Sequence, residues 1–353
     1  MARNTDNTAT ATHNNWQSIR ISAETQIVFD AASENIAHNL QEYFKNDFGI
    51  NPKTTNYQSL KKNFITFQVD ENLSDEGYEL SVSEDKIIIC AKNNTGWFYA
   101  TQTLMQICSY NSYYSKYENY IKIKEIKIKD TPRFKWRSFM LDEARYFKGM
   151  KQVKMLLDEM AFLKMNIFHW HLVDDQGWRI EIKKYPKLTT IGSKRKSTQI
   201  GPLQWESPMQ SAEPHEGFYT QKEIKEIIAY AKERHITVVP EIEMPGHSTA
   251  AIASYPWLGT SREEIEVPIK FGVGKDVYDV TNERTYQFLT DVLDEVMALF
   301  PSKIIHIGGD EVKYNHWKSS ASVQKYMKQN NLATPADLQV YWFFAKSYGL
   351  VIP

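Results

Sequence analysis

The most constraining feature of this sequence is the alternation of apolar runs with helical patterns that begins after Pro132. The runs are nearly continuous in apolar residues and lie at 136–144, 165–173, 236–244 and 303–312. Between them, apolar residues recur at helical spacing, as in Val153, Leu157 and Met160 or in Leu289 and Val292. Apolar strands that alternate with helices indicate βα units around a parallel sheet buried on both faces.

Two helix starts are marked by their capping residues. Thr220 and Glu223 form a capping box before the apolar stripe that begins at Ile224. Thr334-Pro335 places a capping hydroxyl before a proline in the first turn, which predicts a further helix.

Each predicted strand ends in ionisable residues. They are Asp142, Glu143 and Arg145; Asp174 and Asp175; Glu241, Glu243 and His247; and Asp310 and Glu311. The active site of a (β/α)8 barrel lies at the carboxyl ends of its strands. A doubly wound open sheet would instead carry a glycine-rich phosphate loop after its first strand, and this sequence has none. We therefore predict an α/β fold with a (β/α)8 TIM-barrel domain.

The number of predicted strands falls short of a closed barrel. Four strands and the beginning of a fifth at 349–353 are visible, whereas closure requires eight. We therefore expect residues 131–353 to form an incomplete barrel domain, truncated after about its first half. A half-barrel would expose an apolar sheet edge, which promotes association.

A smaller α/β domain is predicted for residues 16–130, after a disordered tail at 1–15. Strands are expected at 25–30 and 63–70, and a hairpin at 80–90 with its turn at Glu84-Asp85. Isoleucines alternate with lysines from Ile121 to Ile128, which predicts one half-exposed strand. The segments 31–47 and 95–109 are expected to be helices that cover one face of the sheet.

Composition excludes several functional classes. The formal net charge is −1, so no electrostatic surface for nucleic acid or an anionic membrane is indicated. No apolar run is long enough to span a bilayer, and the polar N-terminus does not resemble a signal peptide.

Two cysteines cannot form a disulfide framework. Aromatic residues make up 13% of the chain, which suits either sugar stacking or a rich core.

The most informative motif is the segment from His306 to Glu311, in which two glycines precede two adjacent carboxylates. The glycines allow a ligand to approach the backbone closely. Where a strand opens into a loop, adjacent carboxylates can face one pocket, which a regular strand would prevent. Paired carboxylates are typical of glycoside hydrolysis. A solvated acidic loop is the alternative for this segment taken alone.

Histidines near the strand ends make a metal site an alternative interpretation of these residues. His169 and His171 share one face of their predicted strand, and His247 and His306 lie at the ends of two others. Together with the carboxylates they could bind Zn²⁺, as in a metal-dependent barrel hydrolase. Such hydrolases usually carry the His-x-His pair on the first strand, whereas here it lies on the second.

Four blocks of this sequence resemble the signature segments of β-N-acetylhexosaminidases of glycoside hydrolase family 20. They are WRSFMLDEARYF, NIFHWHLVDDQGWRIEI, PEIEMPGH and HIGGDEV, in the family's order between Pro132 and Trp317. The region 16–130, with YELSV, IIICA and GWFYATQTLMQI, is similar to the non-catalytic domain that precedes the barrel in that family. The resemblance implies a hydrolase of terminal β-linked N-acetylhexosamine that needs no metal or other cofactor.

The resemblance also implies a role for each matching residue. Glu311 matches the general acid/base, and Asp310 matches the residue that holds the 2-acetamido group of the substrate. Arg145 matches the arginine that binds hydroxyls of the terminal sugar. Asp174 and His247 match a hydrogen-bonded relay that orients Glu311. The mechanism is then substrate-assisted, with the acetamido oxygen as nucleophile.

Two departures from the family's pattern affect the expected activity. Glu243 stands where the family more often has aspartate. The segments that supply the family's tyrosine donor, tryptophan walls and a sugar-binding glutamate are missing from this sequence. We therefore expect an oligosaccharide or glycoconjugate as the partner, but little or no activity from this chain alone, because transition-state stabilisation requires a complete preorganised site.

The sequence leaves other questions open. A metal-dependent hydrolase and a non-catalytic sugar-binding protein remain alternatives. The choice between GlcNAc and GalNAc, the linkage and the oligomeric state are not determined. The family suggests a secreted, periplasmic or lysosomal location, which the N-terminal sequence does not support.

Overall fold

The structure is a computed structural model that describes residues 17–56, 60–113, 118–201 and 207–345. The predicted tail at 1–15 and the predicted fifth strand at 349–353 lie outside the described residues. The chain divides into two compact units, and the division falls between Lys135 and Trp136. Each unit is described by itself.

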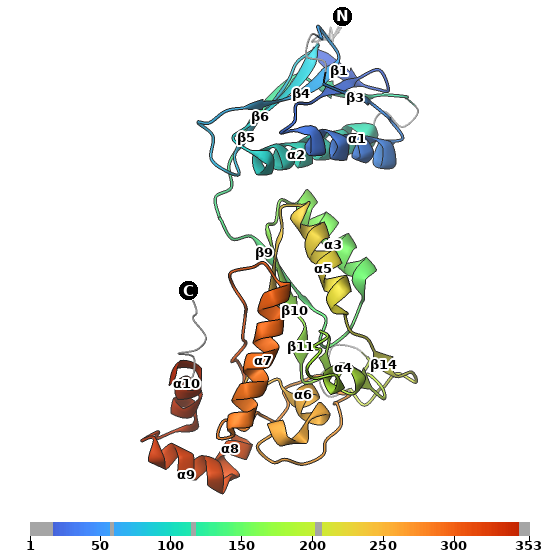
Figure 1. Ribbon diagram of the computed structural model, residues 1–353. Coiled ribbons are helices and arrows are strands. Elements are labelled where there is room, and N and C mark those ends of the chain that lie inside the picture. The colour runs from blue at the N-terminus through green and yellow to red at the C-terminus, as the bar shows by residue number, and fades with distance from the viewer. Residues whose placement is uncertain (1–16, 57–59, 114–117, 202–206, 346–353) are drawn as a thin grey trace, which may run out of the picture. The chain divides into compact units, whose positions relative to one another are not determined.

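The N-terminal unit contains a six-stranded sheet in the order β3-β2-β4-β6-β5-β8. The strands are β2 (Gln26–Val28), β3 (Lys53–Thr55), β4 (Phe64–Val69), β5 (Tyr78–Val82), β6 (Lys86–Ala91) and β8 (Ile126–Asp130). Helices α1 (Glu34–Phe48) and α2 (Asn94–Ser112) lie against one face of this sheet (Figure 1). The predicted hairpin is confirmed, since β5 and β6 pair antiparallel and Ser83 N donates to Lys86 O.

Each of the two helices of this unit has a capping residue at one end. In α2, the Asn93 side chain accepts hydrogen bonds from the backbone N–H groups of Thr95 and Gly96. Helix α1 ends at Gly49, whose φ of 66° lies in the left-handed region that favours glycine. Both predicted helices are therefore confirmed, within a few residues at each end.

The prediction of one strand from Ile121 to Ile128 is wrong. The segment divides at Glu125 into β7 (Ile121–Lys124) and β8, which belong to different sheets. Strand β7 pairs antiparallel with β1 (Ser18–Ile21), and Glu125 N continues that ladder by donating to Gln17 O. Strand β8 pairs instead with β5. The alternating pattern is the same in both halves, so the sequence carries no signal for the change of partner.

The second unit is built around three parallel strands in the order β15-β10-β9. They are β9 (Ser138–Asp142), β10 (Ile167–His171) and β15 (Thr237–Glu241), at three of the four places where the sequence predicts strands. The predicted helices follow as α3 (Met150–Phe162), α5 (Gln221–Lys232) and α7 (Glu283–Leu299). The capping box of Thr220 and Glu223 is present at the start of α5.

The prediction of a fourth strand at 303–312 is only partly correct. Among the described residues, this segment pairs with the sheet at one isolated bridge, between Glu241 and His306. His306 N donates to Pro240 O and Ile242 N donates to His306 O, both at 3.0 Å. The chain then turns at Gly308 and Gly309, whose φ values are 65° and 108°. The apolar pattern predicts an extended segment, but these glycines end its pairing with the sheet.

Shorter elements connect the main ones. They are β11 (Val173–Asp174), β12 (Gly177–Trp178), α4 (Lys187–Thr190), β13 (Lys194–Arg195), β14 (His215–Glu216), α6 (Thr249–Ser254), the 3-10 helix η2 (Pro256–Leu258), α8 (Asn315–Ser319), α9 (Ala321–Gln329) and α10 (Pro335–Ala345). Helix α10 begins after Thr334, whose Oγ1 accepts from Asp337 N, as predicted. Within the described residues, no helix is long and apolar enough to cross a membrane.

Candidate active site

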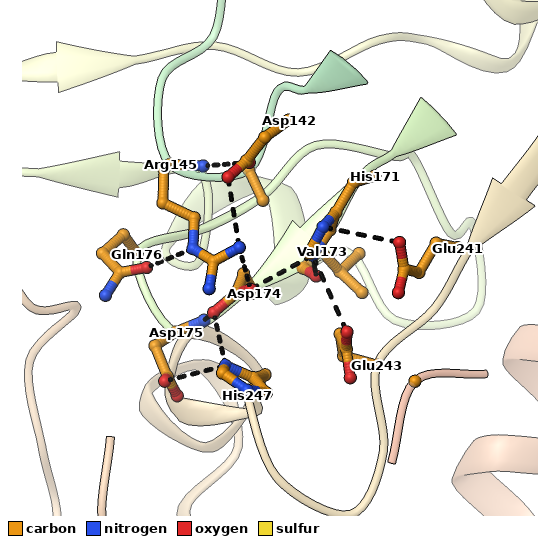
Figure 2. A network of polar contacts seen from close by, with 12 residues as sticks. Asp142, Arg145, His171, Val173, Asp174, Asp175, Gln176, Glu241, Glu243 and His247 are labelled. Atoms are coloured by element: carbon orange, nitrogen blue, oxygen red, sulfur yellow. Dashed lines mark hydrogen bonds and ion pairs between the residues drawn. The ribbon is translucent and has the colours of Figure 1, made fainter. Parts of the chain in front are cut away.

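The carboxyl ends of the three parallel strands bring polar side chains into one row. Asp142 of β9, His171 of β10 and Glu241 of β15 are direct neighbours in the strand register. The side chains of His171 and Glu241 meet, with Nδ1 and Oε2 3.4 Å apart. Figure 2 shows this row together with the residues that follow each strand. The predicted position of the site, at the carboxyl ends of the strands, thus brings these groups together.

Asp174 is the centre of the buried part of this network. Its carboxylate lies 2.7 Å from Arg145 Nη1, 3.1 Å from His171 Nε2 and 3.1 Å from His247 Nδ1 (Figure 2). The Asp174 side chain is fully buried. Burial by itself would raise its pKa, but hydrogen bonds from the two histidines and the charge of Arg145 outweigh burial and lower the pKa of Asp174 to about 2. Asp174 is therefore an ionised buried carboxylate.

His247 connects Asp174 to the exposed carboxylates. Its Nδ1 lies 3.1 Å from Asp174 and 3.5 Å from Asp175. Burial opposes its charge, but the two aspartates prevail and raise the pKa of His247 to about 11, so the ring is a buried imidazolium. Its Nε2 lies 3.8 Å from both Asp310 Oδ2 and Glu311 Oε2, which is an ion-pair distance rather than a hydrogen bond.

Asp310 and Glu311 themselves are exposed. Their side chains are 64% and 56% accessible, and both belong to the turn that begins at Gly308. The backbone of this turn is held from α10, because Gln339 Nε2 donates to Gly309 O at 2.7 Å and Tyr314 OH donates to Gln339 Oε1. The predicted carboxylate pair therefore faces His247 but is largely open to solvent.

The guanidinium of Arg145 contacts two carboxylates and one side-chain amide. Its Nη1 lies 3.1 Å from Asp142 as well as 2.7 Å from Asp174, and its Nε donates to Gln176 Oε1. Burial works against the charge, but the two carboxylates outweigh it and raise the pKa of Arg145. Gln176 is fixed in turn by donating to the carbonyls of Lys270 and Gly272. Arg145 thus joins the same ionic network as Asp174 and His247, a link that the sequence did not reveal.

A second cluster lies beside the first and is centred on Glu241. Its two carboxylate oxygens contact His169 Nε2 and His306 Nδ1, each at 2.7 Å. Burial alone would raise the pKa of Glu241, but the histidines outweigh burial and hold it well below its usual range. Glu243 is buried next to this group, and desolvation together with the Glu241 charge raises its pKa. Ionisation is therefore favoured at Glu241 and disfavoured at Glu243.

Several residues that hold the site were not identified from the sequence. The buried guanidinium of Arg179 donates to the carbonyls of Glu143, Ala144, Gln176, Ser193 and Gly217. Arg195 donates to the carbonyls of Arg145 and Gln176. Thr249 and Gly274 N, which the sequence did not single out, donate to the side chain of Asp175, which it did. Most of these contacts join segments far apart in the sequence, so no local pattern could have indicated them.

The histidine–carboxylate contacts that a metal site would use are also present. Among the described residues, four groups bring potential ligand atoms close together: His169, Glu241 and His306; His171, Glu241 and Glu243; Asp174, Asp175 and His247; and His247, Asp310 and Glu311. A metal binds the unprotonated ring nitrogen of histidine. Two of these groups share Glu241 and two share His247, and a metal at any of them would require a histidine nitrogen without its proton.

The fold and site define the general class of this protein. A parallel α/β sheet with ionisable side chains gathered at the carboxyl ends of its strands is the arrangement of the active-site end of a (β/α) barrel. A family model described as "Glycosyl hydrolase family 20, catalytic domain" matches residues 134–351. A second model, for domain 2 of the same family, matches residues 9–131. The chain belongs to glycoside hydrolase family 20.

Similar proteins agree with this membership. A β-hexosaminidase of Porphyromonas gingivalis is 42% identical over 76% of this chain and 33% of its own length. One of Vibrio furnissii is 41% identical over 78% of this chain and 44% of its own length. The crystal structure of an exo-β-N-acetylglucosaminidase of Vibrio harveyi with N-acetylglucosamine aligns with a TM-score of 0.78, at 33% identity, over 92% of this chain and 50% of that one.

These comparisons also show how much of the family's full length this chain covers. The chain spans less than half the length of these curated relatives. It consists of the family's small α/β domain and part of its (β/α)8 catalytic barrel. The half-barrel expected from the count of predicted strands agrees with this coverage.

Proposed function

We propose that the protein hydrolyses terminal β-linked N-acetylhexosamine from chitooligosaccharides or glycoconjugates. The observation that carries this proposal is the ionic connection from buried Asp174 through protonated His247 to the exposed pair of Asp310 and Glu311. The β-hexosaminidase names of the relatives and the N-acetylglucosamine bound by the Vibrio harveyi structure support it.

The proposed reaction uses the acetamido group of the substrate as its nucleophile. Glu311 donates a proton to the glycosidic oxygen while the acetamido oxygen attacks the anomeric carbon, and the bond to the leaving alcohol breaks. Asp310 accepts a hydrogen bond from the acetamido N–H and stabilises the cationic oxazolinium. Glu311 then removes a proton from water as the water oxygen attacks the anomeric carbon. The bond between that carbon and the acetamido oxygen breaks, which opens the oxazolinium ring and restores the acetamido group. Two inversions give net retention of configuration.

The remaining site residues act by position and charge. Arg145 is proposed to bind sugar hydroxyls, because it lies at the end of β9 with its guanidinium fixed by Asp142, Asp174 and Gln176. His247 places a positive charge 3.8 Å from each of the two reacting carboxylates. A charge fixed before the reaction stabilises the transition state without the cost of reorganisation.

This chain alone is expected to hydrolyse substrate weakly or not at all. Asp310 and Glu311 are more than half exposed, whereas efficient catalysis requires a site that excludes water. The test is release of the aryl group from an aryl β-N-acetylglucosaminide, with the aryl β-glucoside and Glu311→Gln as controls. The assay is run on this chain and on a form extended through the rest of the barrel.

The outcomes of this assay separate the alternatives. Cleavage of only the acetamido substrate by the extended form, abolished by Glu311→Gln, is the expected result. Strong cleavage by this chain alone would refute the expectation of weak activity. An inactive extended form that still binds the sugar would favour the non-catalytic sugar-binding protein.

A metal-dependent hydrolase is the second candidate, supported by the grouping of His169, Glu241 and His306. Its two histidines and one carboxylate form a ligand set that suits Zn²⁺. Loss of activity on chelation and its return with stoichiometric zinc would establish this candidate. The substrate-assisted mechanism instead predicts that a chelator leaves activity unchanged.

A further inference from the structure

The turn from Gly308 to Glu311 has a backbone conformation that needs support from other segments. Gly308, Gly309 and Glu311 have φ values of 65°, 108° and 48°, all in the left-handed region. This region is unfavourable for a residue with a side chain, such as Glu311, and the glycines before it restrict the backbone least. Such a conformation persists only where the surrounding structure fixes it. The orientation of the carboxylate pair therefore depends on contacts from outside the turn.

Helix α10 supplies a direct contact to the middle of this turn. Gln339 Nε2 donates to Gly309 O at 2.7 Å, and this carbonyl belongs to the peptide bond that leads into Asp310. A Cβ at Gly309 would lie 3.2 Å from Phe343 Cζ, so the helix also packs against the turn. The two carboxylates themselves approach the nearest histidine only to 3.8 Å. The hydrogen bond from α10 is therefore the shorter and more directional of these contacts.

Tyr314 determines which end of the Gln339 amide faces the turn. Its hydroxyl donates to Gln339 Oε1 at 2.7 Å. The oxygen of a side-chain amide accepts hydrogen bonds, whereas its nitrogen donates them. With Oε1 engaged by Tyr314, Nε2 is presented to the Gly309 carbonyl. The two hydrogen bonds therefore form a chain in which each supports the other.

The same chain of contacts leads back to the loop that carries His247. Tyr314 stacks on the buried indole of Trp317, with the ring centroids 5.7 Å apart. Trp317 Nε1 donates to Tyr278 O at 3.0 Å. Tyr278 N in turn donates to Pro245 O, two residues before His247. The carboxylate turn and the His247 loop are therefore held by one connected set of contacts.

We propose that Gln339, oriented by Tyr314, is a positioning residue for the Asp310–Glu311 turn. It acts on the reaction through the peptide bond that precedes Asp310, by keeping both carboxylates in one orientation relative to His247. An acid that is oriented before the substrate binds does not lose that freedom in the transition state. This inference rests on the proposed function, since it concerns how the reacting carboxylates are held.

The first test is an NMR measurement on this chain, and it requires no activity. Glycine is followed directly by aspartate once in the sequence, at Gly309-Asp310. A sample made by cell-free synthesis with carbonyl-¹³C glycine and amide-¹⁵N aspartate therefore gives one signal that joins these two residues. Its ¹³C shift reports on the hydrogen bond to the Gly309 carbonyl, and its ¹⁵N relaxation reports on the order of the Asp310 amide.

Two substitutions remove the two hydrogen bonds separately. Gln339→Met keeps the length and helix propensity of the side chain but removes the donor. We expect the Gly309 ¹³C signal to move to lower frequency and the order parameter of the Asp310 amide to fall from about 0.85 toward about 0.6. Tyr314→Phe should move the ¹³C signal in the same direction by a smaller amount. Because both side chains act through one hydrogen bond, the double variant should match Gln339→Met alone.

Gln287→Met is the matched control, because it makes the same substitution on α7 of the same unit. The amide of Gln287 donates to Asp291 Oδ1, not to the turn. The control should therefore leave the Gly309–Asp310 signal unchanged. A change as large as that in Gln339→Met would show that the signal responds to general loosening of the unit, and would contradict the proposal.

The second test is kinetic and uses the form extended through the rest of the barrel. Gln339→Met should lower kcat about tenfold or more with little change in KM, because misplaced catalytic groups weaken transition-state binding. Gln287→Met should leave both constants unchanged. An active extended form whose kcat is insensitive to Gln339→Met would overturn the proposal.

The NMR result also decides the proposal by itself. It is overturned if Gln339→Met leaves the Gly309–Asp310 signal in place, or if the effects of Gln339→Met and Tyr314→Phe simply add. An inactive extended wild type would instead reject the proposed function. In that case the NMR signal still shows whether Gln339 holds the turn.

Discussion

At the scale of single residues, the candidate site is distinguished by buried side chains that stay ionised although desolvation favours their neutral forms. Asp174 keeps its negative charge because Arg145, His171 and His247 all contact it. His247 keeps its positive charge because Asp174 and Asp175 face its Nδ1. Each charge offsets the cost of burying its partners, so removal of Asp174 leaves buried cationic groups less well compensated.

Asp174→Asn is therefore expected to destabilise the second unit by about 3 kcal/mol near pH 5.5. The Asp174 pKa is lowered to about 2, so its contribution is present above about pH 4 and is lost as the pH falls through about 2. The His247 pKa is raised to about 11, so its contribution is complete below about pH 6.5 and is lost as the pH rises through about 11.

Urea unfolding at about pH 3, 5.5 and 9 tests this expectation. The difference in unfolding free energy between wild type and Asp174→Asn should be largest at the middle pH. Asp75→Asn, which removes an exposed ion pair with Lys92, is the control and should have little effect. A difference that stays constant across the three pH values would contradict the assigned ionisation states.

At the scale of elements, the turn after His306 depends on the absence of a side chain at Gly308. Its φ of 65° is unfavourable for other residues, and a Cβ there would fall on the carboxylate of Glu243. Gly49 has nearly the same φ, 66°, but a Cβ there would meet no atom within 4 Å. An alanine at position 49 therefore tests backbone strain alone, whereas an alanine at position 308 tests the same strain together with a steric clash.

Gly49→Ala is expected to cost about 1–2 kcal/mol from its backbone conformation alone. Gly308→Ala should cost more, and it should also displace Asp310 and Glu311. Thermal or urea unfolding of both variants measures the difference. Shortening Glu243 to alanine in the Gly308→Ala background should recover part of the loss. Equal losses in the two single variants would show that the Glu243 contact is unimportant.

At the scale of the whole molecule, the parallel sheet has an exposed edge. Strand β9 pairs with β10 on one side, and no other described strand pairs with it. Phe139 and Met140 of β9 are 43% and 49% accessible. The exposed apolar edge expected of a half-barrel is thus present, and such an edge is a template for pairing with another chain.

We expect this chain to self-associate through β9 and Met140→Lys to weaken that association. A lysine on an edge strand opposes further pairing by its charge. Sedimentation velocity over a range of protein concentrations measures the effect. Val69→Lys is the matched control, because Val69 is 55% accessible but lies on β4 of the other unit, which has strands on both sides. Equal effects of the two substitutions would exclude the β9 edge as the contact.

Local sequence patterns determined the main elements and the end of the sheet at which the candidate site lies. The apolar runs located β9, β10 and β15, and the ionisable residues after them located Asp142, Asp174 and Glu241. Capping residues located α5 and α10, because a cap acts within one turn of its helix. These features depend on neighbours in the chain, so the chain itself specifies them.

Only the tertiary structure decided which of these groups meet and which of them are charged. The contacts of Asp174 with Arg145 and His247, and of Glu241 with His169 and His306, join residues from different strands and loops. The division of the Ile121–Ile128 segment between two sheets is also a choice of distant partners. Charge in a buried site depends on distance and desolvation, and both are fixed only when separate segments pack together.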